Sequence, residues 1–357
     1  MTGRIAAWAW MGVVAGAIGV GTAFGNDAAT PAASTPGGPA PLRIEPVGLS
    51  LTSPYEAGKI PVVFVHGLWI GPRMWEPTIR TLASDPKLAS AFQFWTFGYA
   101  SGDPLPYSAY QLRRALDDAR ARLDPARRDR AFDRMVIVGH SMGGILAKLM
   151  AVDSGDHFWR LASDSPPDRL SGDPDDASLA RESLIFRARP EVRTVVFIAT
   201  PHRGGTPDQR ILHDVAALLV RPPDPLQQAY RRLVAANPPD FFKPAFRVGL
   251  VTSIDQMRWD SPTLAELLAL KPPAPVAMHS IIPVKNGPAG PGGDDGIVTY
   301  ASAHLDDAAS ETVVRAGHFC TEAPETLARL RAILGEAAAP DATPAGGFQL
   351  AVPSTVR

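Results

Sequence analysis

One short stretch near the middle of the chain constrains its fold more than any other. Residues 135–144 read Met-Val-Ile-Val-Gly-His-Ser-Met-Gly-Gly, and residues 145–150 continue with good helix formers. The apolar, β-branched run predicts a buried strand, and the residues after it predict a helix. Between them the pattern G-x-S-x-G places Ser141 on a tight strand-to-helix turn. Gly139 and Gly143 have no side chain, so they would not collide with the neighbouring strand or helix.

A turn of this kind suits a reactive hydroxyl group. We expect a strained backbone that exposes Ser141 at the carboxyl-terminal edge of a sheet. The N–H of Met142, at the start of the new helix, would then point at a developing oxyanion. His140 belongs to the same motif and is expected to support it. A chance glycine-rich turn is the alternative, and the strand and helix on either side favour the catalytic interpretation.

Composition describes a chain that can bury a large core. Of the 357 residues, 45% are hydrophobic and 20% charged, so a single large domain is feasible. The net charge is -1 and the basic residues are scattered, which favours neither nucleic acid nor an anionic membrane as a partner. The only cysteine is Cys320, so no disulfide can form within the chain.

The first 25 residues predict export. They hold one early cation, Arg4, and an apolar run over residues 5–24 that ends in small residues. This pattern is typical of a secretory signal peptide, with an uncleaved membrane anchor as the alternative. Either interpretation delivers the protein to the periplasm or beyond the cell, and an uncleaved anchor would hold it at the inner membrane. We expect a disordered linker over 26–41, a folded domain over 42–336 and a flexible tail over 337–357.

Apolar runs and helical spacing outline the rest of the domain. Polar or proline-broken helical stretches over about 153–190 and 206–270 predict cap or lid insertions between core strands. Outside them, strands are predicted at 60–65, 92–99, 192–198, 275–283 and 311–315, and helices at 75–89, 108–123 and 322–334.

A serine hydroxyl needs a base, and that base needs an orienting acid. His318 follows the last predicted strand and precedes the closing helix, on a loop from which an imidazole can reach the serine. His202 competes but follows a different strand, so we expect it to line or brace the site. His66 ends the strand at 60–65, and a role in bracing its loop is favoured over catalysis.

We expect the acid that orients the histidine to follow the penultimate strand, on the glycine-rich loop at 292–298. Asp295 is the preferred candidate because Gly296 lets the turn close behind it. Asp294 is expected to be a solvated turn carboxylate or a partner of the site. An Asp-Gly pair is also an ordinary turn signal, which is the alternative for both residues.

Five segments together resemble the α/β-hydrolase superfamily, and more narrowly the exported lipase- or esterase-like hydrolases of bacteria. The resemblance spans roughly residues 61–334 and implies a central, mostly parallel sheet with helices on both faces. It implies the triad Ser141, Asp295 and His318, and a second oxyanion donor from the loop after the strand at 60–65. Gly67 lets that loop approach the serine, so we assign this role to the N–H of Leu68. The five segments are 63–68, 139–144, 199–204, 295–298 and 317–318.

The resulting expectation is a serine hydrolase that acts on small-molecule or lipid carboxylic esters through an acyl-enzyme. The reaction would need no metal ion and no organic cofactor. The same residues could instead transfer the acyl group to an alcohol or amine, or cleave an amide or a polyester. A non-catalytic binding module with the same fold is a further alternative, which the intact Ser, Asp and His disfavour.

Overall fold

The computed structural model describes residues 47–206, 224–273 and 275–339. The predicted export segment at 1–25 and the linker at 26–41 lie outside these residues, and so does nearly all of the predicted tail. Those assignments therefore stay predictions. Within the three described ranges, no helix combines the length and apolar character needed to cross a bilayer.

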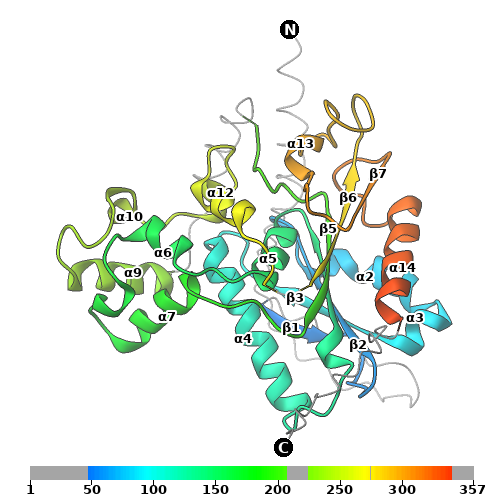
Figure 1. Ribbon diagram of the computed structural model, residues 1–357, viewed down its shortest axis with the longest axis horizontal. Coiled ribbons are helices and arrows are strands. Elements are labelled where there is room, and N and C mark those ends of the chain that lie inside the picture. Colours follow the sequence, from blue (N-terminus) through cyan, green and yellow to red (C-terminus); the bar gives the residue numbers. More distant parts are fainter. Residues whose placement is uncertain (1–46, 207–223, 274, 340–357) are drawn as a thin grey trace, which may run out of the picture.

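A seven-stranded sheet forms the centre of the molecule, with strand order β1-β3-β2-β4-β5-β6-β7 (Figure 1). All neighbouring strands run parallel except β1, which pairs antiparallel with β3. The parallel pairing brings the carboxyl ends of six strands to one edge, where ligands usually bind in such sheets. The strands are β1 (Gly48–Leu51), β2 (Ile60–Val65), β3 (Phe92–Gly98), β4 (Met135–His140), β5 (Val192–Ile198), β6 (Ala277–Pro283) and β7 (Ser310–Val314).

Side chains of each central strand alternate between two apolar cores. Val63 and Val65 of β2 face one core, whereas Val62 and Phe64 face the other. The first core packs against α4 (Leu105–Leu123) and α5 (Met142–Ala151), and the second against α2 (Glu76–Ala83), α3 (Pro86–Ala91) and α14 (Pro324–Ala338). Burial on both faces explains why β2 and β4 are continuous apolar runs. The predicted α/β-hydrolase fold class is confirmed.

Two details of the fold differ from the sequence-based expectation. The single helix predicted over 75–89 is wrong, because two helices, α2 and α3, occupy this region. The first helix ends at Ala83, and Asp85 caps the second by accepting a hydrogen bond from the Lys87 N–H at 2.9 Å, with Pro86 at the first helical position. Strand β1 was not predicted at all.

A lateral lobe projects from one side of the sheet (Figure 1). It has a small core of its own, built around Trp159, Phe241 and Phe242. A salt bridge between Arg232 and Asp176, 2.7 Å long, joins two of its helices. The lobe comprises α6 (His157–Ala162), the 3-10 turn Pro167–Arg169, α7 (Pro174–Leu184), α9 (Asp224–Ala236) and α10 (Pro244–Val248).

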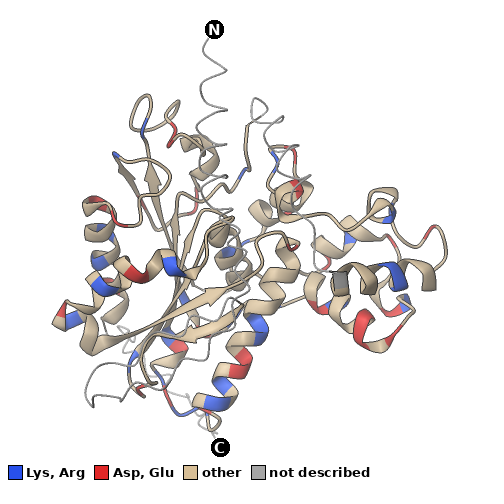
Figure 2. Ribbon diagram, turned by 180° about the vertical axis from the view of Figure 1, so that it is seen from behind, with Lys and Arg blue, Asp and Glu red and all other residues tan. Residues whose placement is uncertain are grey.

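Short helices complete the described part of the chain. They are the 3-10 turns Pro72–Trp75 and Phe132–Arg134, and the helices α11 (Ser253–Gln256), α12 (Pro262–Ala269) and α13 (Tyr300–Ala303). Acidic and basic residues are interspersed along the helices (Figure 2).

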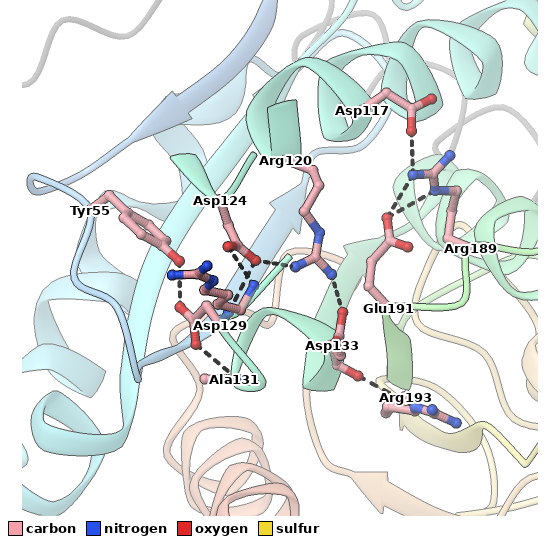
Figure 3. Close-up of polar contacts among 11 residues, drawn as sticks. Tyr55, Asp117, Arg120, Asp124, Asp129, Ala131, Asp133, Arg189, Glu191 and Arg193 are labelled. Carbon is pink, nitrogen blue, oxygen red and sulfur yellow. Dashed lines mark hydrogen bonds and ion pairs between the residues drawn. The ribbon is translucent and has the colours of Figure 1, made fainter. Parts of the chain in front are cut away.

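Ion pairs occupy the end of the sheet where β4 and β5 begin (Figure 3). Arg120 on α4 bonds to Asp124 at 2.8 Å and to Asp133, and its guanidinium lies 4.0 Å from the centre of the Phe132 ring. Arg189 bonds to both Asp117 and Glu191. These contacts tie α4 to the segments that enter the two central strands.

Candidate active site

The turn after β4 has the strained geometry that the sequence predicts. Ser141 has a φ of 53°, in a region that residues other than glycine rarely adopt. Its N–H donates to the Ile198 carbonyl at 2.8 Å, and its own carbonyl accepts from the Gly144 N–H at 2.9 Å. The first bond anchors the turn to β5 and the second begins α5, so the strain is held from both sides.

The glycines around Ser141 are there because of close backbone packing. A Cβ at Gly139 would lie 2.4 Å from the Gly143 carbonyl oxygen, and one at Gly143 would lie 2.3 Å from the Val65 carbonyl oxygen. At Gly67 it would come within 3.1 Å of the Ser141 Cβ. A side chain at Gly143 would therefore push the end of β2 away from the turn, and one at Gly139 would collide with the start of α5.

Three predicted residues form one hydrogen-bonded chain. The Ser141 Oγ lies 3.0 Å from the Nε2 of His318, and the Nδ1 of the same ring lies 2.7 Å from the Oδ2 of Asp295. These residues come from the β4–α5 turn, the segment after β7 and the loop after β6. His318 and Asp295 are both buried, with 6% and 3% of their surfaces exposed. Distances of this size would let His318 accept the Ser141 proton while Asp295 holds the ring.

The carboxylate of Asp295 is fixed by its own loop. Its Oδ1 accepts the N–H groups of Ile297 at 2.8 Å and Val298 at 2.6 Å, which leaves Oδ2 for His318. Asp294, the alternative, turns elsewhere and accepts from the Asn286 side chain and the Gly296 N–H. Geometry therefore separates the two adjacent carboxylates and joins only Asp295 to the histidine.

Two backbone N–H groups are available beside the serine. Met142 is the first residue of α5, and Leu68 follows Gly67 at the end of β2. Within the described residues, neither amide donates a hydrogen bond to another protein group. The Leu68 loop is held in place because the next amide, that of Trp69, donates to the Ser101 Oγ at 3.1 Å.

Both ring nitrogens of His66 form hydrogen bonds to the surrounding backbone. Its Nδ1 bonds to the Gly67 carbonyl at 2.8 Å, its Nε2 accepts the Tyr99 N–H at 3.2 Å, and its ring stacks on that of Tyr99. Burial lowers the pKa of His66 to about 4. A ring with both nitrogens bonded and so low a pKa is a poor general base.

His140, next to Ser141, and His202, which follows β5, are also buried. The Nε2 of His140 donates to the His318 carbonyl at 2.9 Å, and burial, followed by the charge of His318, lowers the pKa of His140 to about 3. His202 meets Phe197 edge to face at 4.6 Å, and burial holds its pKa well below the usual range. Of these two, only His140 contacts His318.

Sequence reasoning missed the contribution of Tyr99 and Ser101. Tyr99 also donates its hydroxyl to the His66 carbonyl at 2.8 Å, so it holds both ends of that residue. The available signal was position, because both follow β3 at the same sheet edge as the serine.

In the described ranges, no three or more His, Cys, Asp or Glu side chains gather as a metal site. Phe319, beside His318, leaves 56% of its surface exposed.

The chain matches a family model and is similar to solved structures at low sequence identity. A search of curated proteins returned no match. Solved structures that resemble the chain include a Bacillus licheniformis lipase, BlEst2, at 16% identity and a TM-score of 0.42, covering 81% of this chain and 99% of that one. Esterase B from Lactobacillus rhamnosis is 13% identical with a TM-score of 0.44, covering 81% of this chain and 80% of that one. An esterase from Thermogutta terrifontis is 15% identical with a TM-score of 0.41, covering 82% of this chain and 94% of that one. A family model described as the alpha/beta hydrolase family matches residues 62–330. The chain belongs to the alpha/beta hydrolase family.

Proposed function

We propose that this protein is a serine hydrolase that cleaves carboxylic esters through an acyl-enzyme. The observation that carries the proposal is the hydrogen-bonded chain from Ser141 through His318 to Asp295. With Asp295 bonded to the Nδ1–H of His318, the Nε2 is free to accept the hydroxyl proton. The strained turn and the two unengaged amides support the same assignment.

The steps follow from these positions. His318 takes the proton of Ser141 as its Oγ attacks the acyl carbonyl carbon, and Asp295 stabilises the imidazolium that forms. The N–H groups of Leu68 and Met142 bind the oxyanion of the tetrahedral intermediate. His318 then gives the proton to the leaving alcohol. Water cleaves the acyl-enzyme by the same route in reverse, and the free acid is released.

An apolar acyl group suits the surroundings. The exposed Phe319 ring stands next to the base and meets the His318 ring edge to face at 5.4 Å. An exposed apolar ring at this position favours the acyl part of an ester over a charged substrate.

The direct test is hydrolysis of p-nitrophenyl esters of increasing chain length. Wild type should turn over, while Ser141→Ala and His318→Ala should fall to background. Release of product as a new ester or amide when an alcohol or amine is added would make the protein an acyltransferase. A purified wild type that is inert on every ester would overturn the proposal.

A further inference from the structure

A second cleft lies away from Ser141. It has a volume of about 580 Å³ and lies between α4, the segment joining α7 to β5, and the residues that lead into β6. It reaches Val192, the first residue of β5, whereas the triad lies beyond the carboxyl ends of the strands. Because β5 has seven residues, the two places are separated by about 20 Å of strand.

Arg113 in the wall of this cleft is buried without full hydrogen bonding. Only 6% of its surface is exposed, and its guanidinium lies 3.9 Å from the centre of the Phe186 ring. Its Nη2 donates to the Glu182 carbonyl at 3.0 Å, but its Nη1 has no partner in the part of the chain that the structure describes. A buried donor without an acceptor is costly and often marks a binding site.

The nearest charge increases the need for an anion. Burial and then the neighbouring Arg189 lower the pKa of Arg113 to about 9. Arg189 itself is neutralised by Asp117 and Glu191, to which it bonds at 2.5 and 2.8 Å (Figure 3). Of the carboxylates near Arg113, Asp117 is bonded to Arg189, and the Glu182 Oε1 accepts the hydroxyl of Ser178 at 2.6 Å.

The charge balance of the cleft is positive by a small amount. Five arginines and three acidic residues line it. Within the described ranges, Arg113, Arg114 and Arg187 have no carboxylate partner in a salt bridge, and the last two are exposed at the surface. Asp153 is occupied, because it accepts the Ala188 N–H at 2.7 Å. This excess of positive charge suits an anionic ligand.

The remaining wall is largely apolar, with contributions from Ile185, Phe186 and Val276. A volume of this size is typical of sites for small organic ligands. We propose that the cleft is a second ligand site for a monocarboxylate with an apolar body, whose carboxylate pairs with Arg113. Medium-chain fatty acids are the simplest members of this class. The inference does not depend on the proposed ester hydrolysis.

Titration calorimetry with sodium octanoate tests the site. Arg113→Met keeps a long side chain against Phe186 but removes the guanidinium donor. Octanoate should therefore bind the variant at least 10-fold more weakly than wild type. Arg122→Met is the matched control, because Arg122 is an exposed arginine of the same helix outside the cleft. That variant should bind octanoate within about twofold of wild type, as a change away from the site should.

Three further arms make the result decisive. Octan-1-ol and inorganic phosphate should each bind wild type at least 10-fold more weakly than octanoate, because each lacks one half of the ligand. Arg187→Glu changes an exposed residue of the cleft and should also weaken octanoate binding, which decides the question if Arg113→Met does not fold. The proposal would be overturned if octanoate bound a folded Arg113→Met, or Arg187→Glu, as tightly as wild type. It would also be overturned if octan-1-ol or inorganic phosphate bound wild type as tightly as octanoate does.

Discussion

The two ends of the sheet handle polar groups in opposite ways. Where β4 and β5 begin, Arg120 and Arg189 each bind two carboxylates, so charges are paired (Figure 3). Where the same strands end, Ser141 and Ala199 adopt positive φ angles. There, the described residues offer no partner to the amides of Leu68 and Met142 or to the Nδ1 of His140.

This difference separates stability from function. The paired charges of Arg120 and Arg189 hold α4 against the strands, and these two residues need no ligand to balance their charge. Strain and open donors cost free energy, and they are tolerated where the rest of the fold overdetermines the local structure. We therefore expect substitutions at the carboxyl-terminal edge to change catalysis, and substitutions in the ion pairs at the opposite end to change stability without changing catalysis.

The largest expected effect is on the acid of the triad. Asp295→Asn keeps the shape of the side chain but no longer favours the correct histidine tautomer, so kcat should fall about 1,000-fold or more. Stopped assays with a p-nitrophenyl ester measure this. Asp294→Asn is the control and should retain activity within a few-fold. Loss of activity in Asp294→Asn but not in Asp295→Asn would reverse the assignment of the acid.

A methyl group at Gly143 should break the active edge through packing. Its Cβ would meet the Val65 and His66 carbonyl oxygens at 2.3 and 2.5 Å. Gly143→Ala should lower the free energy of unfolding by about 3 kcal/mol, measured by urea denaturation. Gly335→Ala in α14 has open space and should instead gain about 0.5–1 kcal/mol. A Gly143→Ala protein as stable as wild type would contradict the packing described for the turn.

Breaking the ion pairs at the other end should cost stability alone. Arg120→Met leaves Asp124 and Asp133 without their shared cation, and it should cost about 3 kcal/mol in the free energy of unfolding. Specific activity of the folded protein should stay within twofold of wild type. Arg122→Met, an exposed change on the same helix, serves as the control for stability. A large fall in kcat for Arg120→Met would contradict the expectation that the ion pairs affect stability and not catalysis.

A smaller, pH-dependent effect is expected from Lys148 on α5. The side chain is 1% exposed, its Nζ has no hydrogen-bond partner within the described ranges, and burial lowers its pKa to about 8. The unfolded chain therefore binds more protons between pH 8 and 10.5, so this residue makes stability rise with pH across that window.

Lys148→Met should raise the free energy of unfolding at pH 7 by about 1–3 kcal/mol and remove that part of the pH dependence. Unfolding curves of both proteins at pH 7, 8, 9 and 10 measure the difference. A gap between the two proteins that does not narrow as the pH rises would refute the assignment.

Much of the fold could be predicted because buried parallel strands are continuous apolar runs. Six of the strands, β2 to β7, fall where the sequence predicts strands, although β7 is polar in its first three residues and only partly buried. Strand β1 escaped prediction because Gly48–Leu51 is short and only partly buried, and its pairing with β3 depends on residues far along the chain. The break between α2 and α3 could have been read from Asp85 and Pro86, a capping residue followed by proline.

The candidate site was predictable to the level of residue and loop, but not of contact. G-x-S-x-G identified the turn, and chain order drew attention to Asp295 and His318. The bond from His140 to the His318 carbonyl joins residues 178 positions apart, and no local pattern signals it. Arg113 was likewise unremarkable, since its burial against Phe186 arises only when α4 meets the segment after α7.

The central claim is that His318 activates the Ser141 hydroxyl. Mass spectrometry of the intact protein after treatment with a fluorophosphonate tests it most directly. The account predicts one adduct per wild-type chain, located on Ser141, none on Ser141→Ala, and labelling of His318→Ala slowed by at least 100-fold. Wild type without an adduct, or an adduct that persists in Ser141→Ala or forms at the wild-type rate in His318→Ala, would contradict it.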